Sequence, residues 1–203
     1  MNRIFCFVFS LLFMLPACNE QRDQTLTIAV AANMQFAAKD LVNAFTSETG
    51  IKTKLIISSS GQLTAQIKAG APFDVFISAD MKYPMELFSS GHATKKPIVY
   101  AYGKLVLWSL VDSIAPSINT LTSARINHIA IANPKTAPYG MAAIEVLKRH
   151  ALYEPLKNKL VYGESISQTN QFIISKSAGV GFTAKSVVLS PQMEGKGKWT
   201  EID

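Results

Sequence analysis

The amino-acid sequence predicts an α/β protein built from two lobes with a cleft between them. One observation is that short apolar runs typical of strands alternate with amphipathic runs typical of helices. The other is that this alternation occurs twice, separated near residue 100 by a longer β-rich run. With 203 residues, of which 48% are hydrophobic and 17% charged, the chain is long enough to bury one or two ordinary cores.

The first alternation predicts lobe 1, residues 26–100. Gly50 and Gly70 stand where its first two helices should end, because glycine readily adopts the left-handed backbone of a helix C-terminus. Strands followed by helices in this order are typical of a parallel or mixed sheet covered on both faces. Strands are expected at 26–32, 51–58 and 74–78, and helices at 34–50, 61–70 and 80–91.

The second alternation predicts lobe 2, residues 101–190. The run "PIVYAYGKLVLWS", residues 97–109, is extended in character and is the expected crossing between the lobes. Two lobes of similar build joined in this way enclose a cleft. Strands are expected at 128–132, 159–163 and 180–186, and helices at 139–152 and 167–179.

Residues 1–17 are predicted to be an export signal. Arg3 is followed by an apolar stretch, residues 4–15, which is too short to span a bilayer. The next letters, "LPAC", resemble the lipobox of bacterial lipoproteins, so Cys18 is the expected lipid-attachment residue and residues 18–25 a lipidated linker. The alternative is an ordinary signal peptide cut near Ala17. Either cleavage removes Cys6, and one remaining cysteine cannot close an intramolecular disulfide or build a zinc site.

The charge balance excludes one class of partner. Lys and Arg number 20 and Asp and Glu 14, giving a net charge of +6. The sequence has no run of five basic residues and does not interleave aromatic residues with its lysines, so nucleic-acid binding is not expected. The balance supports only a mild attraction for anions.

Four corners between a strand and the following helix carry the functional signal. They read "VAANMQ" (30–35), "ISSSGQL" (57–63), "ANPKTAPYGMA" (132–142) and "YGESISQTN" (162–170). Ligands of such sheets bind beyond the carboxyl ends of the strands, where helix N-termini point unpaired N–H groups into the crevice. Most polar groups at these corners are neutral hydrogen-bond donors, and helix N-termini attract anions. The pattern predicts a site for a compact oxyanion.

Five segments in order resemble the periplasmic molybdate-binding proteins of ABC importers. They are "TIAVAANMQFAAKDLVNAF", "SSSGQLTAQIKAGAPFDVFISAD", "GKLVLWS", "IAIANPKTAPYGMAAIEVL" and "AGVGFTAKS". The resemblance implies a type II periplasmic-binding-protein fold that closes on molybdate or tungstate and presents it to an inner-membrane ABC permease. It further implies a monomer of the periplasm or cell envelope with no cofactor, no direct metal ligand and no enzymatic activity.

The resemblance also implies the ligand-binding residues. They are Asn33, the hydroxyl of Ser60, Tyr139 and the backbone N–H of Ile166. Two features depart from the family: many relatives have Ser at the Asn33 position and Tyr where this chain has Ala184. The sequence also stops at Asp203, short of the C-terminal segment by which relatives return to lobe 1, so residues 190–203 are expected to complete lobe 1 only in part.

Other interpretations of the same residues stay open. Ser58 and Ser59 are expected to be turn and capping residues, because serine favours helix N-caps whatever the function. Tyr139 could be a core aromatic, or bind through either its hydroxyl or its N–H. Sulfate or thiosulfate is the alternative ligand, and the sequence does not rank molybdate against tungstate. A serine hydrolase is disfavoured because no G-x-S-x-G motif occurs.

Overall fold

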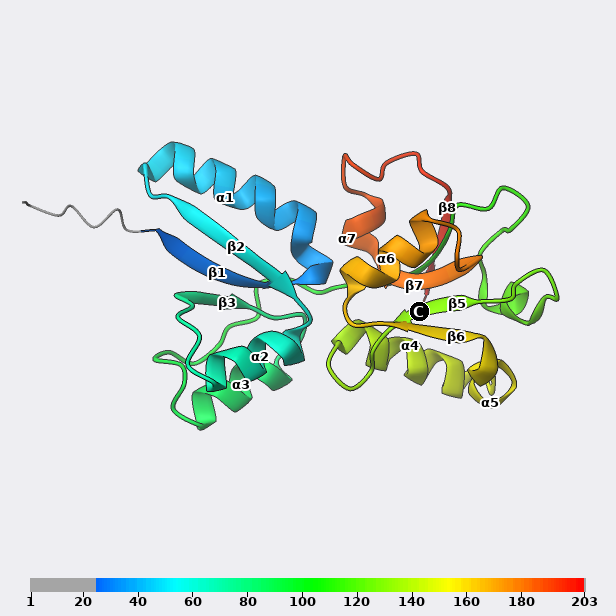
Figure 1. The fold of residues 1–203 in the computed structure, drawn as a ribbon, viewed down its shortest axis with the longest axis horizontal. Helices are drawn as coiled ribbons and strands as arrows, with labels where there is room; N and C mark the ends of the chain where they lie inside the picture. Colours follow the sequence, from blue (N-terminus) through cyan, green and yellow to red (C-terminus); the bar gives the residue numbers. More distant parts are fainter. Residues whose placement is uncertain (1–24, 203) are drawn as a thin grey trace, which may run out of the picture.

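The computed structural model describes residues 25–202 and contains two sheets in that range. The predicted export signal, the predicted lipid-attachment residue Cys18 and most of the predicted linker lie outside the described residues. Figure 1 shows the sheet and helices expected as lobe 1 on the left and those expected as lobe 2 on the right. No helix in the described part of the chain is long and apolar enough to cross a membrane.

Lobe 1 is built on a three-stranded parallel sheet with the strand order β2-β1-β3. Helix α1 covers one face, and α2 and α3 lie on the other (Figure 1). Helix α1 ends where expected, because Gly50 follows it with φ +72° and donates its N–H to the Thr46 carbonyl. The elements are β1 (Leu26–Ala31), a 3₁₀ turn η1 (Ala32–Met34), α1 (Gln35–Thr49), β2 (Thr53–Ser58), α2 (Ser60–Lys68), β3 (Val75–Ile77) and α3 (Lys82–Ser89).

Lobe 2 is built on a five-stranded mixed sheet with the order β6-β5-β7-β4-β8. Strands β5, β6 and β7 run parallel, whereas β4 is antiparallel to both of its neighbours. Every residue of β4, β5 and β7 is buried. The elements are β4 (Leu105–Ser109), η2 (Ile118–Thr122), β5 (Ile129–Ala132), α4 (Pro138–Arg149), α5 (Tyr153–Leu156), η3 (Lys157–Lys159), β6 (Leu160–Gly163), α6 (Ile166–Ile174), β7 (Val180–Ala184), α7 (Lys185–Val188) and β8 (Lys198–Ile202).

The crossing between the lobes contains less strand than its composition predicts. Only residues 105–109 of the run 97–109 form a strand. Residues 97–104 are irregular, and Ile98 and Tyr102 expose 82% and 89% of their surfaces. Their β-forming residues have no neighbouring strand to pair with in the described part of the chain, and strand propensity requires such a neighbour.

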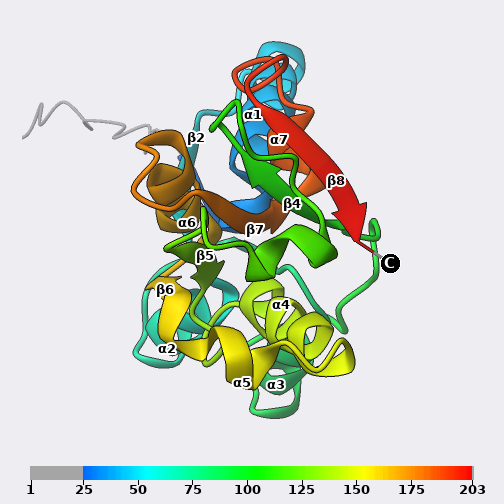
Figure 2. The same cartoon turned by 90° about the vertical axis from the view of Figure 1, so that its right-hand side faces the viewer.

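The C-terminal residues correct one expectation. Residues 190–203 were expected to contribute to lobe 1, but β8 pairs with β4 and so belongs to the sheet of lobe 2 (Figure 2). Trp199 lies opposite Trp108, and the Trp108 indole donates its N–H to the Lys196 carbonyl at 2.8 Å. Strand β4 would otherwise leave one edge unpaired, and β8 satisfies the backbone groups of that edge.

Candidate functional site

One pocket brings together all four residues expected to bind the ligand. Its cavity volume is about 10 Å³, room for little more than one water-sized group and far below the roughly 300–1,000 Å³ of sites for drug-sized ligands. Asn33 enters from the turn after β1, Ser60 from the start of α2, Tyr139 from the start of α4 and Ile166 from the start of α6. The remaining lining residues are Ala31, Ala32, Ser59, Ala79, Ala137 and Pro138.

No charged side chain lines this pocket. Three helices begin at it, and the first N–H groups of a helix have no partner within that helix. Each N-terminus carries roughly half a positive charge, so the pocket favours a negative ligand without a cationic residue. The described part of the chain contains no group of three or more side chains suited to hold a metal ion.

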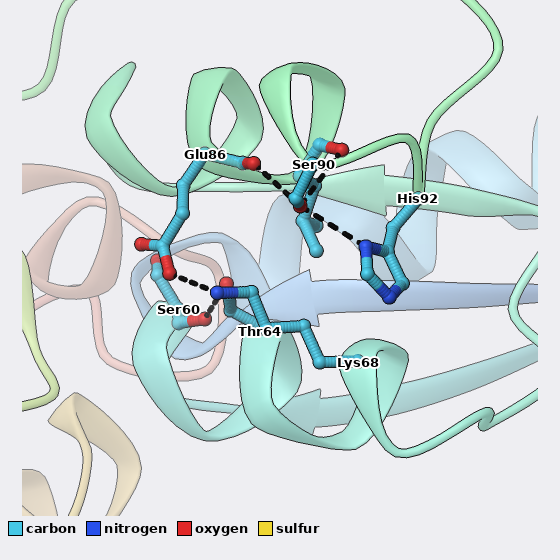
Figure 3. A network of polar contacts seen from close by, with 7 residues as sticks. Ser60, Thr64, Lys68, Glu86, Ser90 and His92 are labelled. Atoms are coloured by element: carbon cyan, nitrogen blue, oxygen red, sulfur yellow. Dashed lines mark hydrogen bonds and ion pairs between the residues drawn. The ribbon is translucent and has the colours of Figure 1, made fainter.

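Ser60 is held so that its hydroxyl proton is free. The residue is fully buried, and its Oγ accepts a hydrogen bond from the backbone N–H of Ala79 at 3.0 Å. Its carbonyl accepts the Thr64 hydroxyl at 2.8 Å, within the first turn of α2 (Figure 3). A serine hydroxyl both accepts and donates, and among the described residues the Ser60 hydroxyl is seen only as an acceptor.

Helix α2 is itself fixed against α3. Lys68 and Glu86 form an ion pair between the two helices, and Ser90 donates to the Glu86 carbonyl at 2.8 Å and contacts His92 Nδ1 at 3.0 Å (Figure 3). Hydrogen bonding to Lys68 lowers the pKa of Glu86. None of these residues lines the pocket, so the contacts support the helix and form no part of the site.

Asn33 is a buried amide with one unused end. It is 8% exposed, its backbone carbonyl accepts the Ser186 hydroxyl from lobe 2 at 2.7 Å, and its Oδ1 has no hydrogen-bond partner among the described residues. A half-turn of the amide exchanges Oδ1 and Nδ2, so the side chain can offer the pocket either an acceptor or a donor.

Tyr139 follows Pro138, which begins α4 and presets the backbone there. Its side chain is 8% exposed, and burial raises the pKa of the phenol to about 12 although a hydrogen bond with Asn33 lowers it in part. A Cβ added to Gly103 would stand 2.2 Å from the phenol oxygen. The hydroxyl therefore lies against the crossing between the lobes as well as near Asn33.

Ile166 lines the pocket at the start of α6. It is the first residue of α6, its side chain is buried in the core of lobe 2, and Ser165 before it accepts the Gln168 N–H at 3.5 Å as a helix cap. Ala184 is fully buried at the end of β7 and does not line the pocket. Glu164 does not line the pocket either. Its carboxylate accepts a hydrogen bond from the Gln62 side chain at 3.2 Å.

The lobes touch around the pocket, so the described arrangement is closed. Figure 1 shows α2 beside the start of α4, and Gly61 there donates its N–H to the Thr136 carbonyl at 2.8 Å. On the opposite side, Ser167 donates to Gln35 Oε1 at 2.7 Å. A Cβ on Gly61 would lie 2.9 Å from both the Cα and the carbonyl oxygen of Thr136, so only glycine permits this approach.

One lining residue was not expected to bind a ligand. Ser59 was interpreted as a capping residue, yet its side chain makes no cap hydrogen bond and its buried Oγ has no partner among the described residues. Ser58, by contrast, uses its hydroxyl locally on Gln62 Oε1. The only sequence signal that could have singled out Ser59 is its place in the "SSSG" run beside Ser60.

Comparison with known proteins places the chain among solute-binding proteins. The pattern of the family described as bacterial extracellular solute-binding protein matches residues 26–203. The molybdate-binding protein ModA of Rhodobacter capsulatus is 43% identical over 172 residues, which are 84% of this chain and 68% of that protein.

Solved structures agree with this relationship. The periplasmic molybdate-binding protein of Azotobacter vinelandii superposes with a TM-score of 0.83 at 33% identity, covering 88% of this chain and 79% of that one. The sulfate-binding protein SubI of Mycobacterium tuberculosis superposes with a TM-score of 0.68 at 13% identity, covering 88% and 71%. The second likeness is one of fold alone.

Proposed function

Because the chain belongs to the bacterial extracellular solute-binding protein family, we propose that it captures molybdate or tungstate and delivers the anion to the permease of an ABC importer. The observation that carries the proposal is the pocket between the lobes, which is lined by neutral residues only and opens onto three helix N-termini. The relationship to the molybdate-binding proteins of Rhodobacter and Azotobacter supports the choice of ligand.

A dianion can be held here without a counter-charge. Hydrogen bonds to a charged partner are shorter and stronger than neutral ones, and each contributes about 1.5–3 kcal/mol. We assign Ser60 as a hydroxyl donor, Asn33 as an amide donor after the half-turn of its side chain, and Ile166 as a backbone N–H donor. Tyr139 donates through its N–H, its hydroxyl or both.

When Tyr139 binds the anion through its N–H, the Asn33 half-turn also gives the Tyr139 phenol a partner. With Oδ1 turned toward the phenol, the Tyr139 hydroxyl donates to it, and Nδ2 then faces the anion. The side-chain oxygen Oδ1 of Asn33, which has no partner among the described residues, thereby gains one when the ligand binds. The chemistry is binding alone: no residue of the proposed site acts as a nucleophile, base or acid.

Sulfate and thiosulfate are the competing ligands, and the 13% identity to a sulfate-binding protein gives them little support. Isothermal titration of the exported domain with sodium molybdate, sodium tungstate, sodium sulfate and sodium phosphate tests the choice. We expect molybdate and tungstate to bind at least tenfold more tightly than sulfate. Tighter binding of sulfate would overturn the proposed ligand while leaving the binding-protein function intact.

Phosphate, in the same titration, tests whether the pocket offers a hydrogen-bond acceptor. At pH 7 it carries an O–H group, and burying that group unpaired costs about 1–3 kcal/mol, so we expect phosphate to bind more than tenfold more weakly than molybdate. Phosphate affinity within tenfold would identify an acceptor in the pocket. Asn33 Oδ1, left in its described orientation, is the candidate.

Asn33→Asp is the variant that tests the site itself. It keeps the size of the side chain but places a carboxylate against a dianion, and like charges repel strongly in a buried site. We expect molybdate affinity to fall by about a hundredfold or more. Asn119→Asp, on the surface of lobe 2, is the matched control and should bind as the wild type does. Unchanged affinity of Asn33→Asp would remove Asn33 from the site.

We also propose where the protein acts and how it is attached there. The family relationship supports export to the periplasm, and the permease of an importer is the partner that receives the anion from a monomer. Cys18 is proposed to carry the lipid anchor. Cys18→Ala should then move the protein from the membrane fraction into the soluble fraction after export. A wild-type protein that is already soluble would favour the ordinary signal peptide cut near Ala17.

A further inference from the structure

Ser59 has a buried hydroxyl with no hydrogen-bond partner among the described residues. Its side chain lines the pocket, the residue is 3% exposed and its Oγ is one of the few buried polar atoms left unpaired. Burying a hydroxyl without a partner is unfavourable, and native proteins rarely leave one in this state. An unpaired polar group of this kind calls for a specific reason.

Helix capping does not supply the reason. Ser59 occupies the N-cap position of α2 with extended backbone, φ −73° and ψ 151°, but its side chain makes no cap hydrogen bond. Two other serines of this chain show what a used cap looks like. Ser117 accepts the Thr120 N–H at 3.3 Å and Ser165 accepts the Gln168 N–H at 3.5 Å. The Ser59 hydroxyl is therefore available to something inside the pocket.

Ser60, the next residue, also lines the pocket, so two hydroxyl groups lie side by side there. Ser60 Oγ has one lone pair occupied by the Ala79 N–H and keeps its proton for a ligand. Ser59 has both its proton and its lone pairs unused. The two residues stand at the N-cap and first position of α2, where the helix N-terminus also favours negative charge.

We propose that Ser59 binds the oxyanion directly through its hydroxyl, as a second donor beside Ser60. This inference rests on the proposed function, because it assigns a further residue to the same anion site. The unpaired Oγ gains its partner only when the anion is present. In the absence of ligand, the hydroxyl destabilises the protein slightly.

Titration with sodium molybdate tests the inference on the purified exported protein. Ser59→Ala should bind molybdate about ten- to a hundredfold more weakly, the effect of losing one hydrogen bond to a charged partner. Ser59→Cys keeps nearly the same size but has only a weak S–H donor, so it should lose most of the same affinity. Ser117→Ala removes a used cap that does not line the pocket, and this variant should bind molybdate as the wild type does.

The melting temperature without ligand separates binding from capping. Ser117→Ala should melt at a lower temperature than the wild type, because it loses a cap. Ser59→Ala should melt at the same or a higher temperature, because it loses only an unpaired hydroxyl.

Wild-type affinity in Ser59→Ala overturns the inference, and a lower melting temperature in the same variant would then identify Ser59 as a cap. A wild-type protein that fails to bind molybdate overturns the proposed ligand instead, so the two failures are distinguishable.

Discussion

The two lobes have similar elements but very different cores. In lobe 2 three strands are buried along their whole length and one hydrophobic cluster extends from β4 to α7. The separate cluster of lobe 1 contains only Ile28, Val30 and Ala38 as buried members, and its edge strand β3 has three residues, with Val75 39% exposed. Lobe 1 therefore buries fewer apolar side chains than lobe 2, and Leu63 and Leu87 are its other large buried aliphatic residues.

Part of the apolar surface of lobe 1 is buried against lobe 2. Phe36, Ile57 and Ala79 of lobe 1 pack against the cluster of lobe 2. These residues lie at or beside the corners that line the pocket. Closure of the pocket and stability of lobe 1 therefore depend on the same contacts, so a bound ligand should stabilise lobe 1 more than lobe 2.

The largest expected effect compares the two cores directly. Trp108→Ala in lobe 2 removes a fully buried ring and should lower the free energy of unfolding by about 3–5 kcal/mol. Val42→Ala in lobe 1 removes a partly buried side chain and should lower it by about 1 kcal/mol. Urea denaturation followed by circular dichroism measures both. Equal losses would contradict the difference between the lobes.

The next effect concerns the phenol at the junction of the lobes. The pKa of Tyr139 is raised to about 12 in the folded state, against about 10 in an unfolded chain. The folded state therefore holds this proton more tightly, and its contribution to stability is complete below pH 10 and is lost as the pH rises toward 12. The loss from this residue reaches about 2–3 kcal/mol.

Tyr139→Phe should accordingly lose less stability than the wild type between pH 10 and 12, when urea denaturation is repeated across that range. The same variant reports on ligand binding at pH 7. If the phenol donates to the anion, affinity falls by about ten- to a hundredfold; if only the N–H donates, affinity is unchanged. A pH profile identical to that of the wild type would show that the phenol is not buried at the junction.

A smaller effect should come from the contact that lets the lobes close. Gly61→Ala places a methyl group against the Thr136 backbone, and such overpacking costs about 1–3 kcal/mol. The methyl group would also lie 2.8 Å from the Tyr83 hydroxyl of the same lobe. Because the open form avoids the clash with Thr136, we expect weaker molybdate binding and a larger radius of gyration in small-angle X-ray scattering with ligand. Gly179→Ala, whose Cβ would meet only the tip of the Ile114 side chain at 3.2 Å, is the control. Unchanged binding by Gly61→Ala would exclude this contact from closure.

The smallest effect lies on the outer side of lobe 1. Glu86→Gln removes the ion pair with Lys68. The Lys68 side chain is 38% exposed and the Glu86 side chain 41%. Exposed pairs contribute little, so the free energy of unfolding should change by less than about 0.5 kcal/mol and molybdate affinity should not change. A larger loss would mean that the weak core of lobe 1 relies on its surface contacts.

Local patterns in the sequence determined most of the elements and the four corners of the site. The alternation of apolar residues, the stop at Gly50 and the start at Pro138 act over a few residues, so they can be recognised without knowing the rest of the chain. The family resemblance added which corner residues to consider, and the structure brings Asn33, Ser60, Tyr139 and Ile166 into one pocket.

The tertiary structure alone decided the features that depend on distant partners. Strand β8 lies on β4, some ninety residues away in the sequence, because an open sheet edge was available there. Ser59 and Ser117 are both serines at a helix start, but only Ser117 uses its hydroxyl as a cap. Whether a side chain finds its partner nearby, across a cleft or in a ligand is settled by packing between residues that are far apart in the sequence, and no local pattern encodes it.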